Sequence, residues 1–346
     1  MIGEARYEIR ALLGEGTYGK VFKALDRVTN TEVAIKRIKT STTAGSGDGG
    51  FHFTSIREIK VMKAVKHENV VTLLDLFAGA EQQLNLVMPL LQLDLKQVIA
   101  DRSVVLSMAH VKCIMKQVLA GLDALHSRWF LSRDIAPANI LVNPATGTCL
   151  IADFGLSRTF GTPFPGIIGR RRTFAGVMTS VVVTLWYRAP ELLFGSQHYG
   201  AGVDIWAAGC VFAELLPRLK EEGKTHQLRQ PLFPGGNELD ELQKIFELLG
   251  TPSEVLWKDA VNFPKFQRFT HLPPPPGSWP VELFPQIADS APETDTLLMA
   301  MLSLDPNFRP SARDLLNHEY FNNVPPRPCS EAALAKQIFA HVTSRS

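Results

Sequence analysis

The chain has 346 residues, of which 45% are hydrophobic and 20% charged. These proportions exclude wholesale disorder and suit one large domain or two lobes that share a cleft. The 36 Lys and Arg residues against 34 Asp and Glu residues leave a net charge of +2, which gives no reason to expect direct nucleic-acid binding. The four cysteines are scattered, and no apolar run approaches the roughly 18 residues that span a bilayer. We therefore expect a reduced, intracellular protein of the nucleus or cytoplasm with no membrane association.

The amino-terminal part of the chain is predicted to be rich in strands. A stretch of mostly small and polar residues, Ser41 to Gly50, predicts a flexible loop, and one helix is expected after it, over residues 55–66. Short β-type runs broken by glycine or polar turns occupy residues 7–13, 21–26, 33–38, 70–77 and 84–89.

The chain becomes helical after Leu95. Apolar periodicity predicts helices over residues 109–127, 239–249 and 294–302, and the almost wholly apolar stretch 203–216 suggests a buried helix. The proline-rich run 272–280 is expected to be an ordered loop or linker. We predict an α+β protein with a small β-rich lobe carrying one helix (1–88), a connection (89–94), a larger α-helical lobe (95–321) and a tail packed along the surface (322–346).

A glycine-rich stretch lies between the first two predicted strands. Its residues are Gly14, Glu15, Gly16, Thr17, Tyr18 and Gly19. Glycines let a backbone turn sharply and approach phosphate groups. A glycine-rich hairpin is the commoner explanation of such a pattern. The stretch does not open a helix, which argues against a dinucleotide-binding fold.

Two charged residues after this stretch have competing explanations. Lys36 ends the strand pattern Val-Ala-Ile-Lys, where it could hold nucleotide phosphates or be an ordinary solvated lysine. Glu58, on the following helix, could pair with Lys36. It could equally complete a capping box with Ser55 at the start of the helix.

The residues that could perform chemistry follow in a fixed order. Asp134 lies in Arg-Asp-Ile-Ala-Pro-Ala-Asn and can accept the proton of a hydroxyl nucleophile. Asn139, in the same stretch, and Asp153, in Asp-Phe-Gly, offer the hard oxygen ligands that Mg²⁺ prefers. An Ala-Pro-Glu triplet ends at Glu191. Each motif alone is explained by a turn or a cap, but this order and spacing are not.

With these motifs in place, the sequence resembles the eukaryotic protein kinases over nearly its whole length, and most closely the cyclin-dependent kinases. HFTSIRE, TLWYRAPELLFG, GVDIWAAGC and LFPGGNELDELQKIFELLGTP are phrases of that family. DLKQVIADRSVVLS and LHSRWFLSRD are most similar to the cyclin-dependent-kinase-activating kinases of transcription factor IIH, and the cell-cycle-related kinases are the other candidate.

The resemblance implies a two-lobed kinase that transfers the γ-phosphoryl group of Mg²⁺-bound ATP to Ser or Thr. It also implies a preference for proline after the acceptor, through Val182, Val183 and Arg188. A cyclin is the expected partner, with an assembly factor as a second one. Other kinases' activation segments and the RNA polymerase II C-terminal repeat are candidate substrates.

Residue roles follow from the same resemblance. Asp134 is the expected base, Asn139 and Asp153 the expected Mg²⁺ ligands, and Glu58 is expected to orient Lys36. Met88 matches the gatekeeper, and Pro89 to Leu91 match the hinge that binds adenine. The implied ATP contacts are Leu13, Gly14, Glu15, Gly16, Thr17, Tyr18, Gly19, Val21, Ala34, Lys36, Met88, Pro89, Leu91, Asp94, Leu141 and Asp153. Glu191 is expected to pair with Arg309.

Two positions depart from the family. Ser132 stands where the family has His, and Ala136 where it has the Lys that contacts the transferred phosphoryl group. Ala138 supplies no substitute cation two positions later. Thr184 matches a threonine that bridges to the catalytic Asp. An active kinase is the favoured interpretation, and a nucleotide-binding pseudokinase scaffold is the alternative.

Regulatory sites are also implied. Arg57, Arg133 and Arg158 match arginines that converge on a phosphorylated threonine of the activation segment, here Thr179. Three ordinary surface arginines are the alternative. Thr17 and Tyr18 match inhibitory phosphosites, and the expected cyclin-binding helix, which carries Glu58, is predicted to be poorly positioned without a partner.

Overall fold

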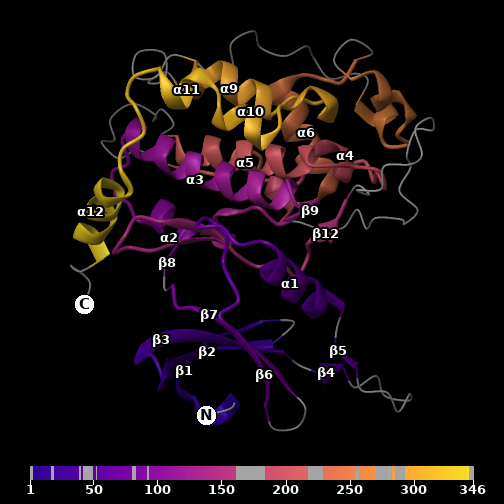
Figure 1. The fold of residues 1–346 in the computed structure, drawn as a ribbon. Helices are drawn as coiled ribbons and strands as arrows, with labels where there is room; N and C mark the ends of the chain where they lie inside the picture. Colours follow the sequence, from indigo (N-terminus) through magenta and orange to yellow (C-terminus); the bar gives the residue numbers. More distant parts are fainter. Residues whose placement is uncertain are drawn as a thin grey trace.

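The protein has two lobes, with a small β-rich lobe at the amino terminus and a larger helical lobe after it (Figure 1). The computed structural model describes residues 3–16, 19–38, 40–41, 50–51, 53–79, 83–91, 93–160, 184–216, 229–253, 257–269, 280, 283–284 and 293–342. In this part of the chain no helix is long and apolar enough to cross a membrane.

The N-lobe is an antiparallel five-stranded sheet in the order β1-β2-β3-β7-β6. Its strands are β1 (Tyr7–Gly16), β2 (Gly19–Asp26), β3 (Thr31–Ile38), β7 (Leu84–Pro89) and β6 (Asp75–Ala78), with a short pair β4 (Thr40–Ser41) and β5 (Gly50–Phe51) beside it. Four of the five predicted strands are confirmed. The fifth, 70–77, is shorter than predicted: its first part contributes one isolated bridge, from Val70 to Ile151, and only Asp75 onward is strand.

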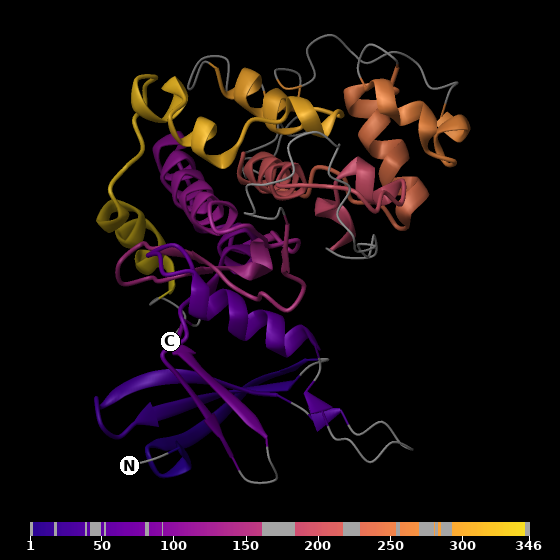
Figure 2. The ribbon, with the colours of Figure 1, turned by 45° about the vertical axis from the view of Figure 1, so that its right-hand side comes forward.

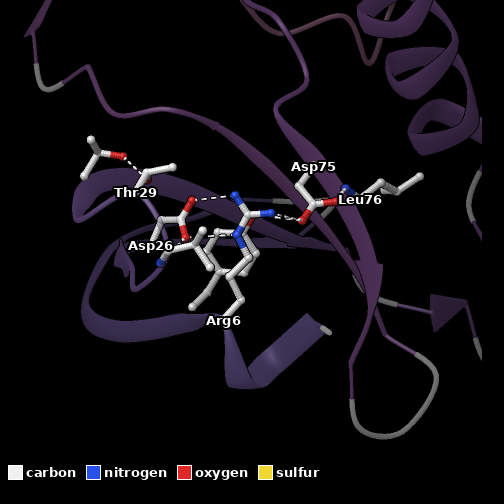
Figure 3. A network of polar contacts seen from close by, with 8 residues as sticks. Arg6, Asp26, Thr29, Asp75 and Leu76 are labelled. Carbon is white, nitrogen blue, oxygen red and sulfur yellow. Dashed lines mark hydrogen bonds and ion pairs between the residues drawn. The ribbon is translucent and has the colours of Figure 1, made fainter. Parts of the chain in front are cut away.

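A polar network connects the two edges of this sheet (Figure 3). Arg6, just before β1, donates to both carboxylate oxygens of Asp26 at 2.9 and 2.7 Å and to Asp75 of β6 at 3.4 Å. The Tyr7 hydroxyl donates to the same Asp75 oxygen at 2.8 Å. The bond from Arg6 holds the pKa of Asp26 well below its usual range. Because β1 and β6 are opposite edges of the sheet, these contacts hold the curled sheet together.

A single helix, α1 (Phe53–Ala64), lies between this sheet and the C-lobe (Figures 1 and 2). It buries Val61 and Met62, and Val65 just after it is buried as well. The helix begins two residues before the predicted start, so Ser55 lies inside its first turn and does not cap it.

The C-lobe is built on two central helices, α3 (Met108–His126) and α5 (Gly202–Leu215), and α5 is buried over nearly its whole length. The four predicted helices are confirmed, with ends that differ from the prediction by at most one residue. The other elements are α2 (Leu95–Ala100), α4 (Pro190–Leu193), α6 (Glu238–Leu249), α9 (Thr294–Met301), α10 (Ala312–Leu316), α11 (Glu319–Asn322), β8 (Leu93–Asp94), β9 (Phe130–Leu131), β10 (Ile140–Val142), β11 (Cys149–Ile151) and β12 (Arg158–Thr159). Most of the run 272–280 lies outside the described residues.

The end of the chain contains a helix that the sequence analysis did not predict. Helix α12 (Glu331–Val342) packs beside α2 and the first part of α3 (Figures 1 and 2). Leu334 and Ile338, one turn apart, are fully buried. This spacing was visible in the sequence, but the prolines before it favoured an irregular tail.

Candidate active site

The N-lobe side of the cleft is organised by one ion pair. Lys36 of β3 donates to both carboxylate oxygens of Glu58 on α1, at 2.7 and 2.8 Å, and lies 3.8 Å from Asp153. Burial lowers the pKa of Lys36, but the charges of Glu58 and Asp153 outweigh it and leave that pKa above its usual value. Lys36 therefore stays a cation in the cleft.

This geometry decides between the explanations left open for both residues. Strand β3 lies inside the sheet between β2 and β7, and the Lys36 side chain is only 16% exposed, so Lys36 is not an ordinary solvated lysine. Glu58 binds Lys36, and Ser55 is not the helix cap, so the capping-box explanation is wrong. In this structure α1 is placed so that Glu58 forms the ion pair with Lys36. The expectation that a partner is needed to position the helix stays a prediction.

The C-lobe side of the cleft is the loop between β9 and β10. The Asn139 amide nitrogen donates to the Asp134 carboxylate at 2.8 Å and to the Asp134 carbonyl at 2.9 Å. The Thr184 backbone N–H donates to the same carboxylate. Burial, with the nearby Asp153 charge, raises the pKa of Asp134 to about 6. The expected contact between Thr184 and Asp134 is thus present, made by the backbone.

A residue that the sequence analysis did not single out shapes this loop. Asp204 of α5 is buried and accepts the backbone N–H groups of Ser132 at 2.9 Å and Arg133 at 2.8 Å. It also lies 2.8 Å from the His126 ring. Arg133 has φ of 61°, a strained conformation that these two bonds maintain. The phrase GVDIWAAGC contained the signal, but its aspartate was not assigned a role.

Asp153 follows β11 in a second strained conformation, with φ of 54°. Its Oδ1 accepts the Gly155 N–H at 3.1 Å, and its side chain is 51% exposed. The carboxylate thus lies beside Lys36 with room for a ligand.

Several residues predicted to contact ATP lie on the strands that border this cleft. Ala34 is buried in β3 opposite Met88, and Pro89 is paired with Val33. Leu141 of β10 pairs with Asp94, whose carboxylate also caps α2 by accepting the Gln97 N–H at 2.7 Å. Leu91 is half-buried just after β7.

The described residues of the glycine-rich stretch form the end of β1 and the start of β2. Leu13, Gly14 and Glu15 are exposed, Gly16 pairs with Gly19, and Val21 pairs with Gly14. A side chain at Gly19 would collide with the Arg37 carbonyl, so the strand packing requires this glycine. Thr17 and Tyr18 lie outside the described residues.

The three predicted phosphate-binding arginines lie close together. Burial, then the positive charges of Arg133 and Arg158, lowers the pKa of Arg57. Arg133 donates to the Leu156 carbonyl and to the Tyr199 hydroxyl, both at 2.7 Å. A cavity of about 230 Å³ is lined by Arg57, Lys60, Val61, Phe130, Ser157, Arg158 and Thr159. Three unrelated surface arginines are excluded, while Thr179 lies outside the described residues.

The two departures from the kinase pattern are buried. Ser132 is fully buried, and its hydroxyl has no hydrogen-bond partner among the described residues. Ala136 is 3% exposed. The pair between Glu191 and Arg309 is confirmed, with nitrogen–oxygen distances of 2.6 and 2.9 Å, fully buried behind the cleft.

Fold and site together define a phosphotransfer enzyme, and comparison with known proteins identifies its family. The family described as protein kinase domain matches residues 7–321. Cyclin-dependent kinase 7 of Dictyostelium discoideum is 42% identical over 318 residues, 92% of this chain and 80% of that protein. Cyclin-dependent kinase 7 of Xenopus laevis is 40% identical over 342 residues, 96% of this chain and 88% of that protein.

A solved structure agrees with this result. The CAK complex from Chaetomium thermophilum, bound to ATP-γ-S, contains a chain that matches with a TM-score of 0.79 and 34% identity, over 94% of each chain. The chain belongs to the protein kinase family, and within it to the cyclin-dependent kinases. It is a serine/threonine protein kinase, and its two-lobed α+β fold is confirmed.

Proposed function

We propose that this kinase transfers the γ-phosphoryl group of Mg²⁺-bound ATP to serine and threonine hydroxyls of proteins, in cell-cycle control or transcription. The observation that carries the proposal is the pairing of Lys36 with Glu58 and Asp153 on one side of the cleft and of Asp134 with Asn139 on the other. The catalytic base, the phosphate-binding cation and the oxygen ligands are all present.

The residues in the cleft fit a magnesium ion. Asn139 uses its amide nitrogen on Asp134, which leaves the amide oxygen available as a ligand. The side chain of Asp153, the second expected ligand, is 51% exposed and therefore accessible to a metal ion. Oxygen donors of these two kinds are what Mg²⁺ prefers. When bound, Mg²⁺ neutralises charge on the phosphate oxygens.

Asp134 has the position and the hydrogen bonds expected of the base. It accepts the proton of the substrate hydroxyl as the hydroxyl oxygen bonds to the γ-phosphorus. The bond from that phosphorus to the oxygen bridging to the β-phosphate breaks, and ADP leaves. Lys36, oriented by Glu58, holds the phosphates in line for this transfer.

Ala136 removes one cation from this site, which is the argument for the scaffold alternative. The base, both metal ligands and the Lys36 ion pair remain, and the comparisons do not favour a pseudokinase. Transfer of radiolabelled γ-phosphate from ATP to a protein substrate tests the proposal, with Asp134→Asn as the control. Equal transfer by both proteins, or none by the wild type with its partner present, contradicts it.

The partner that we propose is a cyclin, bound at α1. The helix carries residues 53–58 of the HFTSIRE phrase and exposes 57% of Ile56, and the structural neighbour is a CAK complex. An assembly factor is a second proposed partner. We expect low basal activity that rises when a cyclin is added. Affinity purification followed by identification of the bound proteins tests this.

We further propose that phosphorylated Thr179 is held by Arg57, Arg133 and Arg158. A phosphate brings about −1.5 to −2 charges and relieves the repulsion between these arginines. We expect Thr179→Ala and Arg158→Ala to lower activity or the half-life of the complex to a similar extent. The proposal fails if both variants match the wild type in both measurements.

We also propose that the kinase prefers proline after the acceptor and that its substrates are proteins with such sites. The RNA polymerase II repeat and the activation segments of other kinases are the candidates. Phosphorylation of matched peptides with Pro or Ala after the acceptor separates a proline-directed kinase from an unselective one.

A further inference from the structure

A second cavity, of about 450 Å³, lies on the C-lobe, and none of the residues that line it is an expected active-site residue. It is formed where the chain leaves α11 and enters α12, against one face of α3. Phe321 and Pro328 contribute apolar surface, and Cys113 and Cys329 place two thiols in hydrogen-bonding contact at its wall. We call it the tail cavity.

The wall of the tail cavity is held rigidly on the lobe. The Cys329 N–H donates to the Ala109 carbonyl at 3.1 Å, and the Thr148 hydroxyl donates to Glu331 at 3.1 Å. Gly147 has φ of 79°, and a side chain there would collide with the Glu331 carbonyl, so only glycine allows this close approach. A ligand would therefore enter a preformed site and lose little free energy to ordering it.

The charges around the tail cavity are unequal. Lys116 from α3 and Arg327 from the tail line it, and both are exposed. Neither has an acidic partner within 4 Å among the described residues. The lining acid Glu331 is already engaged by the Thr148 hydroxyl. Two cations and one carboxylate, which already accepts a hydrogen bond, thus line the cavity, so positive charge is in excess.

We propose that the tail cavity docks a short acidic segment of another protein. Carboxylates would pair with Lys116 and Arg327, and an apolar side chain of the segment would pack against the half-buried Pro328. The size suits a few side chains of a peptide. Two cations beside an apolar floor are too few for the repeated phosphate contacts that hold a nucleic acid. The site goes beyond phosphotransfer, since no active-site residue takes part.

The test is a selection of random dodecapeptides displayed on phage, against the full wild-type chain and against the double variant Lys116→Glu, Arg327→Glu. The matched control is Lys336→Glu, an exposed lysine on α12 that does not line the cavity. We expect the wild type and the control to enrich peptides that combine Asp or Glu with an apolar residue. The double variant should bind those peptides at least tenfold more weakly.

A second measurement locates the bound peptide. Selected peptides carrying a terminal cysteine activated as a thiopyridyl disulfide should label Cys329 of the wild type, and Cys329→Ser should abolish this label. Phosphotransfer to a short peptide should be equal in the wild type and the double variant, which shows that the variant is folded. Neutral or basic selected peptides, equal binding to the double variant, or labelling elsewhere would each overturn the proposal, and none of these results bears on catalysis.

Discussion

The two sides of the catalytic cleft are held in place by different kinds of contact. On the N-lobe side, position depends on one ion pair with two hydrogen bonds, between Lys36 of the sheet and Glu58 of α1. On the C-lobe side, the loop carrying Asp134 is held through its backbone. Asp204 binds two consecutive N–H groups, and the N–H of Thr184 binds Asp134 itself.

This difference explains how the catalytic loop tolerates its two unusual residues. The backbone contacts of the loop do not involve the side chains at Ser132 and Ala136. Losing the family's His and Lys therefore removes an imidazole and a charge but leaves the shape of the loop intact. On the N-lobe side we expect substitution of Lys36 or Glu58 to be harmful, because the side chains themselves make the contact. We infer that the absence of the family's Lys at position 136 weakens stabilisation of the transition state. Substituting Lys36 or Glu58 would instead disrupt the positioning of α1 against the sheet.

The largest effect is expected from Asp204→Asn, which tests the backbone-held side. The amide cannot accept both N–H groups and also keep the contact with His126. We expect the free energy of unfolding to fall by about 3–5 kcal/mol, with loss of phosphotransfer. Denaturant unfolding measures the first and steady-state kinetics the second. Asp123→Asn on α3, whose contact with Arg313 is at the surface, is the matched control and should change stability by less than about 0.5 kcal/mol.

A smaller effect is expected from Glu58→Gln, on the side held by charged side chains. Lys36 keeps a hydrogen bond but loses the adjacent charge, and a charge-assisted bond contributes about 1.5–3 kcal/mol. We expect kcat/KM to fall roughly 10- to 100-fold, with less loss of stability than in Asp204→Asn because Asp153 still lies near Lys36. The exposed Glu68→Gln is the control. Equal destabilisation by both main variants would show that the two sides are not held differently.

Restoring the missing cation should raise the rate modestly. A lysine at position 136 acts on charge that develops during transfer, so Ala136→Lys should increase kcat severalfold and leave the KM for ATP nearly unchanged. A tenfold rise corresponds to about 1.4 kcal/mol. Ala138→Lys places the same charge at an exposed position in the same loop and is the control. Because Ala136 is buried, unfolding is measured for both variants.

The alternative is that one of the arginines 170–172, outside the described residues, already supplies this charge. Ala136→Lys is then neutral or harmful, and replacing the three arginines abolishes transfer. No transfer by any variant that still binds ATP, with the proposed cyclin present, would support the scaffold alternative.

Much of this molecule could be predicted from local sequence patterns. Strands β1, β2, β3 and β7 and helices α3, α6 and α9 follow local patterns in the sequence, and α5 is recognisable from its almost wholly apolar composition. The pairing of Lys36 with Glu58 was expected only through the resemblance to the kinases. The strand predicted over 70–77 was wrong in its first part, because Val70 and Val71 are apolar and buried but contribute only one isolated bridge, from Val70 to Ile151. Helix α12 was missed because its burial depends on α3 and Gly147, far away in the sequence.

The active site, too, could be predicted only in part from the sequence. Motifs named the charged residues, but a motif does not show what holds its backbone. The role of Asp204 depends on two N–H groups about 70 residues earlier, a contact that no local pattern contains. The cluster of Arg57, Arg133 and Arg158 was found only through resemblance, since the three lie on separate elements. The unpartnered hydroxyl of Ser132 is equally invisible without the structure.

That hydroxyl gives the smallest effect and the finest test of the comparison. If the loop is held by its backbone alone, Ser132→Ala removes a buried polar atom that has no partner among the described residues. Leaving such a group unsatisfied costs about 1–3 kcal/mol, and the cavity left by one oxygen is small. We therefore expect Ser132→Ala to be as stable as the wild type or up to about 1 kcal/mol more stable. Its kcat should be unchanged.

Ser157→Ala is the matched control, because Ser157 is equally buried but its hydroxyl donates to the Ser132 carbonyl at 3.4 Å. Losing that hydrogen bond should lower the free energy of unfolding by about 0.5–1.5 kcal/mol. The two deletions of the same atom, in residues that touch each other, should thus have opposite signs in denaturant unfolding. If Ser132→Ala is the more destabilising of the two, then the Ser132 side chain helps to hold the catalytic loop, and the backbone contacts to Asp204 are not sufficient.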